Sequence, residues 1–159
     1  MTLAVRLLQD RSDAEEAVQD AFVQAFRSLE QFRGDSAFST WFYRILYNRC
    51  MSRRRRRRGA PDTIAFADGE DGDWPDDSPA VDDEVGRSDF QDFVAGELER
   101  MPEHFRTALT LFYVQEMKYE EIAATMQVPL GSVKTYLFRG KQQLRRRLQK
   151  RLQAEVRTV

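Results

Sequence analysis

The sequence has few of the residues that build disulfides, metal clusters and nucleophile–base pairs. Its 159 residues include one cysteine, Cys50, and one histidine, His104. A single cysteine excludes an internal disulfide and a cysteine-based metal cluster. Such usage is typical of a reducing compartment, so we expect the cytoplasm. Neither residue has a partner at the spacing that nucleophilic catalysis or zinc binding requires, and the glycines form no phosphate loop. We therefore predict a protein that is not an enzyme and needs no cofactor or metal.

Long hydrophobic runs are also missing. No apolar stretch approaches the roughly 18 residues of a membrane span, and the first ten residues are too short and too interrupted for a signal peptide. We therefore expect no membrane insertion. The 42% of apolar residues still suffices to bury a core, and a chain of 159 residues suits one domain or two small ones.

The two signs of charge are balanced in number but separated along the chain. The 25 lysines and arginines and the 26 acids leave a formal net charge of -1. The acids gather between Asp62 and Glu99, whereas the arginines form two blocks, Arg53 to Arg58 and a second block near the C-terminus. This separation indicates surfaces that bind polyanions.

Helical periodicity dominates the N-terminal part of the chain. Apolar residues recur every three or four positions from Ser12 onward and again from about Ser36 onward, which predicts two long helices. The first stripe consists of Ala14, Ala17, Val18, Ala21, Phe22, Ala25, Phe26 and Leu29. Ser12 and Glu15 have the spacing of a capping box, so the first long helix should start near Ser12. A short helix over residues 3–8 should pack on both.

Periodicity is lost between residues 59 and 87, where Asp, Gly and Pro are frequent. We predict a flexible acidic linker there. A coil of about 28 residues has an r.m.s. span of about 30 Å and a stretched limit of about 95 Å. Such a linker can hold two domains far apart.

The C-terminal part has the layout of a helix-turn-helix. A helix is expected from Ser88, which with Gln91 has capping-box spacing, and Pro102 should open the next helix. A short helix that carries Ile122, a turn at residues 127–131 and a longer basic helix follow. The predicted fold is therefore all-α, with two small helical domains at residues 1–58 and 88–159 joined by the linker at 59–87.

The second helix of a helix-turn-helix lies in the major groove, and its early residues reach bases or phosphates. Lys134, Thr135 and Arg139 form the best candidate reading surface. Ser132 stands at the helix start, where hydroxyls and amides can hold a phosphate. The alternative is an amphipathic helix whose cations are merely solvated.

The segment from Phe32 to Arg58 combines aromatic rings with cations. Its notable members are Trp41, Phe42, Tyr43, Arg44, Tyr47 and Asn48. The first two rings fit the apolar stripe, whereas the two tyrosines fall off it beside the arginine and the amide. Exposed rings next to cations and an amide suit the stacking and reading of unpaired bases. Packing of both tyrosines against another helix is the alternative.

The first long helix also carries an acidic face opposite its apolar stripe. This face comprises Asp13, Glu16, Gln19, Asp20 and Gln24. Acids do not approach DNA, so the face is either solvated or docked on a basic protein surface.

Two segments resemble one family. Residues 13–50, DAEEAVQDAFVQAFRSLEQFRGDSAFSTWFYRILYNRC, resemble the second conserved region of the extracytoplasmic-function group of bacterial sigma factors. Residues 101–148, MPEHFRTALTLFYVQEMKYEEIAATMQVPLGSVKTYLFRGKQQLRRRL, resemble their fourth region. The ordered pair with an acidic linker between its members is a specific signature.

The resemblance implies a dissociable subunit of bacterial RNA polymerase that selects promoters and helps to open them. Its acidic helix would dock on the clamp helices of the largest polymerase subunit, through Asp13, Glu16, Gln19 and Asp20. The −10 element, with one base flipped out of the nontemplate strand, would be read by Phe32, Trp41, Tyr43 and Asn48, with Arg44, Arg53 and Arg54 near the backbone.

The same resemblance assigns the −35 element to Lys134, Thr135 and Arg139, and the flap of the second-largest polymerase subunit to the fourth region. It also implies an anti-sigma factor as a partner. Two departures from the family are a start that lacks most of one helix before Met1 and an unusually long arginine block. The acids of Asp68 to Asp83 could cover that block. A free-standing helix-turn-helix regulator and a protein–protein adaptor are the alternative functions.

Overall fold

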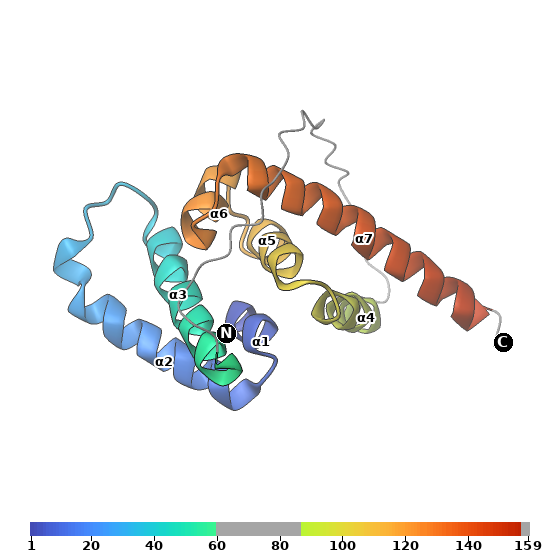
Figure 1. Ribbon diagram of the computed structural model, residues 1–159, viewed down its shortest axis with the longest axis horizontal. Helices are drawn as coiled ribbons and strands as arrows, with labels where there is room; N and C mark the ends of the chain where they lie inside the picture. The colour runs from blue at the N-terminus through green and yellow to red at the C-terminus, as the bar shows by residue number, and fades with distance from the viewer. Residues whose placement is uncertain (60–86, 157–159) are drawn as a thin grey trace.

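The computed structural model describes residues 1–59 and 87–156, and each element within these ranges is a helix (Figure 1). In chain order they are α1 (Thr2–Leu8), α2 (Arg11–Arg27), the 3-10 helix η1 (Leu29–Gln31), α3 (Phe38–Arg58), α4 (Arg87–Glu99), α5 (Glu103–Tyr113), α6 (Tyr119–Met126) and α7 (Leu130–Val156). The prediction of an all-α fold is confirmed. Within the described ranges, none of these helices combines the length and the apolar character needed to cross a membrane.

In the N-terminal half, residues 1–59, α2 and α3 form a hairpin with α1 packed against both. The buried face of α2 consists of alanines at intervals of three or four residues: Ala14, Ala17, Ala21 and Ala25. Their small side chains let α2 approach Leu46 and Cys50 of α3, which are 1% and 0% exposed.

The stripe predicted for α2 is therefore too wide. Phe22, Phe26 and Leu29 were expected in the core, but they are 59%, 80% and 48% exposed. The alanines occupy the inward face, so the larger residues point away from α3 or lie at its margin. Only part of the predicted stripe is buried.

The predicted helix starts also need correction. The cap of α2 is Asp10, whose carboxylate accepts a hydrogen bond from the Asp13 amide at 2.9 Å, so the predicted capping box at Ser12 is wrong. The next long helix, α3, begins at Phe38 rather than near Ser36. It ends at Arg58, and its cap is Gly59, whose φ of 61° lies in the left-handed region that glycine adopts without strain.

In the C-terminal half, residues 87–156, α5 packs on both α6 and α7. Leu111, Ile122 and Val133, one from each of these helices, are fully buried. Pro102 precedes α5 as its cap instead of opening it. The turn between α6 and α7 has Gln127 at a φ of 58°, and α7 begins at Leu130, so the predicted turn at residues 127–131 is too long. The helix-turn-helix layout is otherwise as predicted.

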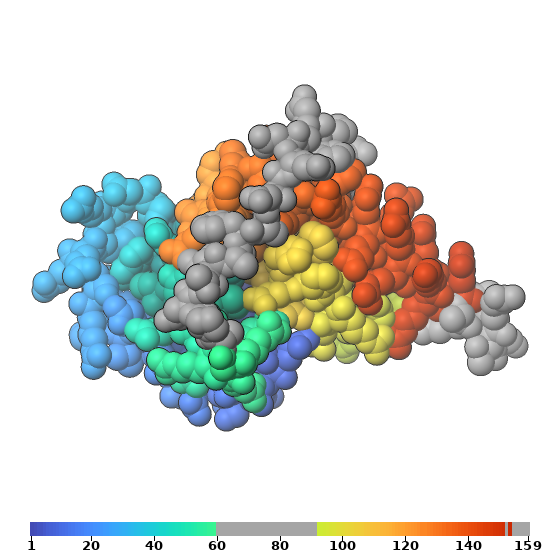
Figure 2. All heavy atoms as spheres, viewed as in Figure 1, coloured from blue at the N-terminus to red at the C-terminus, as the bar shows by residue number. Residues whose placement is uncertain are grey.

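The two halves do not stand apart, as the predicted linker would allow. Buried residues from both form a single apolar cluster, in which α1 packs against α5 and α3 packs against α6. In the space-filling view, the blue and green N-terminal half meets the yellow and orange elements of the C-terminal half (Figure 2). Apart from its two end residues, the predicted linker lies outside the described residues, and the exact domain boundaries stay a prediction.

Candidate nucleic-acid and protein interfaces

The arginine block of α3 is paired with the acids of α2. Because the two helices run antiparallel, Arg53 lies opposite Glu16 and Asp20 and donates to them at 2.9 and 2.8 Å. One turn further on, Arg57 lies 2.6 Å from Asp13 and 3.7 Å from Asp10. The hydrogen bonds that Arg53 donates to Asp20 and Glu16 raise the pKa of Arg53. Residues predicted for protein docking and for DNA binding are thus brought together.

These ion pairs remain open to solvent. The side chains of Glu16 and Asp20 are 60% and 52% exposed, and Gln19 between them is also exposed. Ion pairs of this kind contribute about 0–1 kcal/mol, since water and salt screen them. The acidic face therefore still offers its carboxylate oxygens to another cation.

Arg54 points in a different direction from Arg53. It forms an ion pair with Glu103 of α5, and its side chain is 21% exposed. The resemblance places Arg54 near the DNA backbone, but in this structure the residue joins the two halves of the molecule. Contact with a phosphate would require that pair to break.

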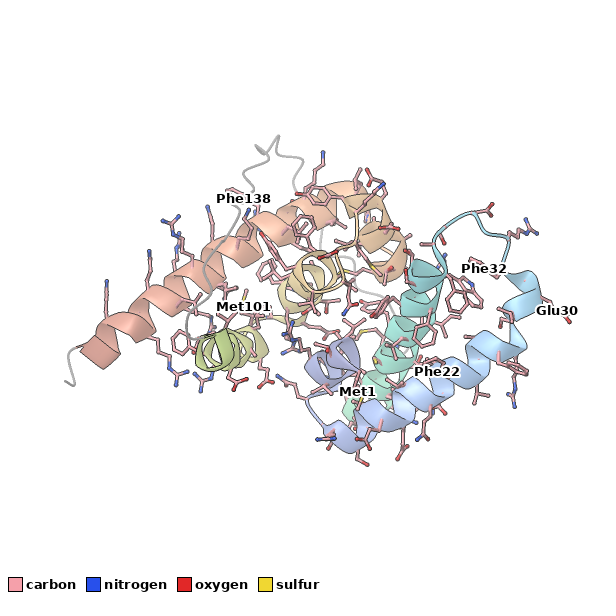
Figure 3. All side chains as sticks on the ribbon, turned by 180° about the vertical axis from the view of Figure 1, so that it is seen from behind. Met1, Phe22, Glu30, Phe32, Met101 and Phe138 are labelled. Atoms are coloured by element: carbon pink, nitrogen blue, oxygen red, sulfur yellow. The ribbon has the colours of Figure 1, made fainter. Side chains whose placement is uncertain are left out.

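An aromatic cluster surrounds the start of α3. The ring centroids of Phe32 and Trp41 lie 5.1 Å apart, and Phe38 lies 5.7 Å from Phe32 and 5.5 Å from Trp41. Figure 3 shows Phe32 in the segment that leads into α3. The structure thus brings two of the predicted base-reading residues together and adds Phe38, which is 50% exposed. Grouped rings that reach the surface suit base stacking.

The remaining predicted −10 residues follow along α3. Arg44 is exposed, whereas Tyr43 and Asn48 are half-buried and so keep part of their surface accessible. Tyr47 differs, because burial, followed by the nearby charge of Glu103, raises its pKa to about 12. Its neighbours Glu103 and Tyr136 belong to the C-terminal half. Tyr47 therefore packs against the C-terminal half, which is the alternative considered for the two tyrosines.

An exposed apolar surface on α2 and η1 was missed in the sequence. It comprises Phe22, Val23, Phe26 and Leu29, each at least 48% exposed. The ring of Phe22 also packs on Phe42 of α3 at 4.6 Å. The four alanines, at intervals of three or four residues, were the available signal. Such small residues mark the face on which another helix packs closely, so the larger apolar residues beside them remain at the surface. We call this surface the α2 apolar patch.

The predicted reading surface of α7 is only partly exposed. Lys134 and Arg139 face solvent, as expected. Ser132 and Thr135 do not, since they are 5% and 4% exposed. The Thr135 hydroxyl donates to the Gly131 carbonyl oxygen at 3.0 Å, within its own helix. The expectation of an exposed Thr135 and Ser132 is therefore wrong for this conformation, and their contact with DNA stays a prediction.

The basic end of α7 is partly structural. Glu97 of α4, whose side chain is 5% exposed, accepts hydrogen bonds from Arg151 at 2.7 Å and Arg100 at 3.0 Å, and lies 3.8 Å from Arg147. The hydrogen bond from Arg151 lowers the pKa of Glu97. Other cations of this end, Arg145, Arg146 and Lys150, are exposed.

The lone cysteine and histidine are packing residues. Cys50 is 0% exposed, and burial raises its pKa to about 12, so it is a poor nucleophile. His104 lies 4.8 Å from the ring of Tyr136, and burial lowers its pKa. Among the described residues, no group of three or more histidine, cysteine or acidic side chains is arranged to hold a metal ion.

Comparison with known proteins identifies the family of this chain. Residues 1–60 match the sigma-70 region 2 family, and residues 95–144 match the sigma-70 region 4 family. The RNA polymerase sigma-H factor of Pseudomonas aeruginosa is 36% identical over 92% of this chain and 79% of its own length. The chain belongs to the sigma-70 family, in its extracytoplasmic-function group.

Two other similarities agree with this assignment. The extracytoplasmic-function sigma-E factor of Escherichia coli is 34% identical over 86% of this chain and 74% of its own length. The sigma factor RpoE of Bartonella quintana, crystallised in complex with the anti-sigma factor NepR, superimposes with a TM-score of 0.70 and 26% identity. That superposition covers 93% of this chain and 88% of RpoE.

In this sigma factor, region 2 comprises α1 to α3, and region 4 begins within α4. The region 4 match ends at residue 144, before the cations at the end of α7. The ion pairs of Arg147 and Arg151 with Glu97 therefore lie partly outside the matched family region.

Proposed function

We propose that this sigma factor binds core RNA polymerase and directs promoter-specific initiation as an alternative sigma factor. The observation that carries the proposal is the presence of both family regions in one chain, with a partly exposed aromatic cluster in region 2 and exposed cations on the second helix of the helix-turn-helix. The polymerase supplies the chemistry, so the sigma factor needs no catalytic residue. It acts in the bacterial cytoplasm, where polymerase and DNA are found.

Docking uses the outer face of α2. The acids Asp13, Glu16 and Asp20, together with Gln19, present oxygens to a basic surface, for which the clamp helices of the largest polymerase subunit are the expected partner. The α2 apolar patch lies on the same helix and on η1, with Phe26 80% exposed. Burial of apolar area supplies most of the free energy of protein association, and charge supplies orientation. The patch therefore extends the docking surface beyond the acids.

Docking has a consequence for DNA binding. Glu16 and Asp20 hold Arg53 in the free protein, at 2.9 and 2.8 Å. A cation from the polymerase that binds these carboxylates competes with Arg53 for the same oxygens. Arg53 is then free to bind a phosphate of promoter DNA, which is also a strong acceptor for a guanidinium group. Core binding thus increases the positive charge that α3 offers to promoter DNA.

The −10 element is read at the start of α3. Phe32, Phe38 and Trp41 provide rings for an unpaired base, and the Asn48 amide can read a base edge, with Tyr43 and Arg44 beside it. Flipping a base costs a few kcal/mol, whereas stacking returns about 1–3 kcal/mol per base. The two terms are comparable, so strand opening proceeds without ATP hydrolysis by the sigma factor.

The −35 element is read in duplex DNA by α7. Lys134 and Arg139 are available for phosphates and base edges, whereas Ser132 and Thr135 must first become accessible. The flap of the second-largest polymerase subunit is a further partner of this half. An anti-sigma factor is also expected, since RpoE of Bartonella quintana was crystallised with one.

Run-off transcription tests the proposal. Purified protein is mixed with bacterial core polymerase and fragmented bacterial genomic DNA, and RNA synthesis should start at defined sites only when the protein is present. Absence of both complex formation and RNA synthesis would refute the function. Binding to a duplex operator without polymerase would favour the free-standing regulator instead.

Two variants then separate the roles of the halves. Asn48→Ala should reduce promoter opening, measured by permanganate reactivity, more than closed-complex formation, measured by filter binding. Arg139→Ala should reduce closed-complex formation while core binding persists. Equal loss in both assays for Asn48→Ala would exclude its role as a base reader.

A further inference from the structure

The second helix of the helix-turn-helix continues well beyond the part that matches region 4. The match ends at residue 144, whereas α7 runs from Leu130 to Val156. Figure 1 shows this last part of α7 extending past α5, with α4 beside it. At about 1.5 Å per residue, Lys150 lies about 30 Å along the helix axis from the start of α7. The family match therefore leaves the role of this last part open.

The cations in the last part of α7 divide by the face of the helix on which they lie. Arg147 and Arg151 face α4, where they lie 3.8 and 2.7 Å from the carboxylate of Glu97. The guanidinium group of Arg151 also lies 5.6 Å from the centre of the Phe93 ring. These contacts hold the end of α7 against α4 and so fix the direction in which it points.

A second set of cations, Arg145, Arg146 and Lys150, is exposed, and we call it the α7 basic strip. Arg146 and Lys150 follow Arg139 by seven and eleven residues. Arg145 likewise follows Lys134 by eleven residues. Seven and eleven residues correspond to about two and three turns of an α-helix, so residues at these spacings share a face. The α7 basic strip therefore continues the exposed part of the predicted reading surface.

The outward face of α7 has no negative charge to oppose these cations. From Leu130 to Gln153 the sequence contains no aspartate and no glutamate. The exposed residues between the cations are glutamines, namely Gln142, Gln149 and Gln153. Their amides donate as well as accept hydrogen bonds, so they do not repel a phosphate group. The positive face thus extends from the start of the helix-turn-helix reading surface into the last turns of α7.

The length of α7 determines which part of DNA this strip can reach. The helix has 27 residues and is therefore about 40 Å long. The major groove is only about 12 Å wide, so the first turns of α7 fill it. The last turns then pass over the edge of the groove, where the phosphates lie, as the end of the third helix does in homeodomains. Phosphates rather than base edges are thus within reach of the α7 basic strip.

We propose that the α7 basic strip binds phosphates of duplex DNA beside the −35 element. It adds up to three backbone contacts that carry no sequence preference and so raise the affinity at any −35 sequence. The inference rests on the proposed function, because it requires the first turns of α7 to lie in the groove at −35. DNA is favoured over an acidic protein as the ligand because the strip lies in line with Lys134 and Arg139.

The salt dependence of DNA binding by the full chain tests the proposal. The variant Arg145→Gln, Arg146→Gln, Lys150→Gln is compared with wild type on a labelled duplex of about 30 base pairs of arbitrary sequence, by fluorescence anisotropy from about 50 to 200 mM salt. Each phosphate contact contributes about 0.9 to the slope of log K against log salt. The slope should therefore fall by about 2–3, and the affinity at about 0.1 M salt should fall at least about tenfold.

The matched control is the variant Thr2→Glu, Arg11→Gln, Ser12→Asp, which removes the same net positive charge at exposed positions of region 2. An equal loss in this control would overturn the proposal, because net charge alone would then explain the effect. An unchanged slope in the α7 variant would also overturn it and would assign the strip to an acidic protein partner. If the triple variant does not fold, Lys150→Gln repeats the test with an expected fall in slope of about 1.

The assay also separates this proposal from the proposed function. It contains no polymerase, so the slopes report on the α7 basic strip whether or not the protein starts transcription. Failure of wild type in run-off transcription would refute the proposed function alone. Failure of wild type to bind the duplex at low salt would refute the role of the strip.

Discussion

The two basic segments of the molecule meet acidic side chains in different ways. In α3, Arg53 pairs with Glu16 and Asp20, whose side chains are 60% and 52% exposed. In α7, Arg147 and Arg151 share Glu97, which is 5% exposed. An exposed pair is screened by water and is easily replaced, whereas a buried carboxylate depends on its partners. Arg53 thus serves as exchangeable charge in α3, whereas Arg147 and Arg151 are structural contacts in α7.

The largest expected effect comes from removing the buried charge. Glu97→Gln should lower the free energy of unfolding by about 2 kcal/mol, because the charge that strengthens the hydrogen bonds from Arg100 and Arg151 is lost while the volume is kept. Glu16→Gln should cost less than about 1 kcal/mol, since Glu16 is 60% exposed and Arg53 keeps its ion pair with Asp20. Urea denaturation of both variants measures the difference. Equal losses in the free energy of unfolding would show that the ion pairs of α3 and those of α7 contribute equally to stability.

A smaller effect concerns DNA affinity. The double variant Glu16→Gln with Asp20→Asn frees Arg53, so the free protein should bind a labelled duplex about fivefold more tightly at low salt, with a steeper salt dependence. Fluorescence anisotropy over a salt series measures both quantities. Glu30→Gln with Asp35→Asn is the matched control, since it removes the same charge at two exposed positions without releasing Arg53. An equal gain in the control would attribute the effect to net charge alone.

The smallest effect is the response of the Glu97 contacts to acid. The pKa of Glu97 in the native protein lies below its ordinary value of 4.5. Its contribution to stability is therefore complete above about pH 4.5 and is lost as the pH falls through the lower native pKa. The stability gap between wild type and Glu97→Gln should stay constant from about pH 7 to about pH 5 and narrow below that. Urea denaturation at several pH values measures the gap, and narrowing already above about pH 5 would contradict the assignment.

The sequence predicted the helices well because their signal is local. Periodicity located all the long helices and the helix-turn-helix, and the capping signals placed their starts within a few residues. Asp10 was overlooked as the cap of α2 because Ser12 offered an equally plausible spacing to Glu15, and only the Asp13 amide, at 2.9 Å from Asp10, decides between them. The burial of Phe22 and Phe26 was mispredicted because apolar character does not reveal which of two adjacent stripes faces the core.

The site was harder to predict because its contacts are long-range. The acids of α2 recur at intervals of three or four, and an unbroken arginine run always has members at that spacing, so an antiparallel hairpin places Arg53 opposite Glu16 and Asp20. That pairing could have been read from the sequence once the hairpin was assumed. The burial of Thr135 and Tyr47 could not, because it depends on how the halves pack.

The position of α1 has a consequence for how the molecule unfolds. Leu3 and Leu7 belong to the same buried cluster as residues of α2, α3 and α5, so neither half has a core entirely of its own. Heat should then melt region 2 and region 4 in one calorimetric transition, with equal van't Hoff and calorimetric enthalpies. Replacing Leu3 and Leu7 with alanine would split that transition into two, and each sigma region would then melt at a temperature set by its own helices.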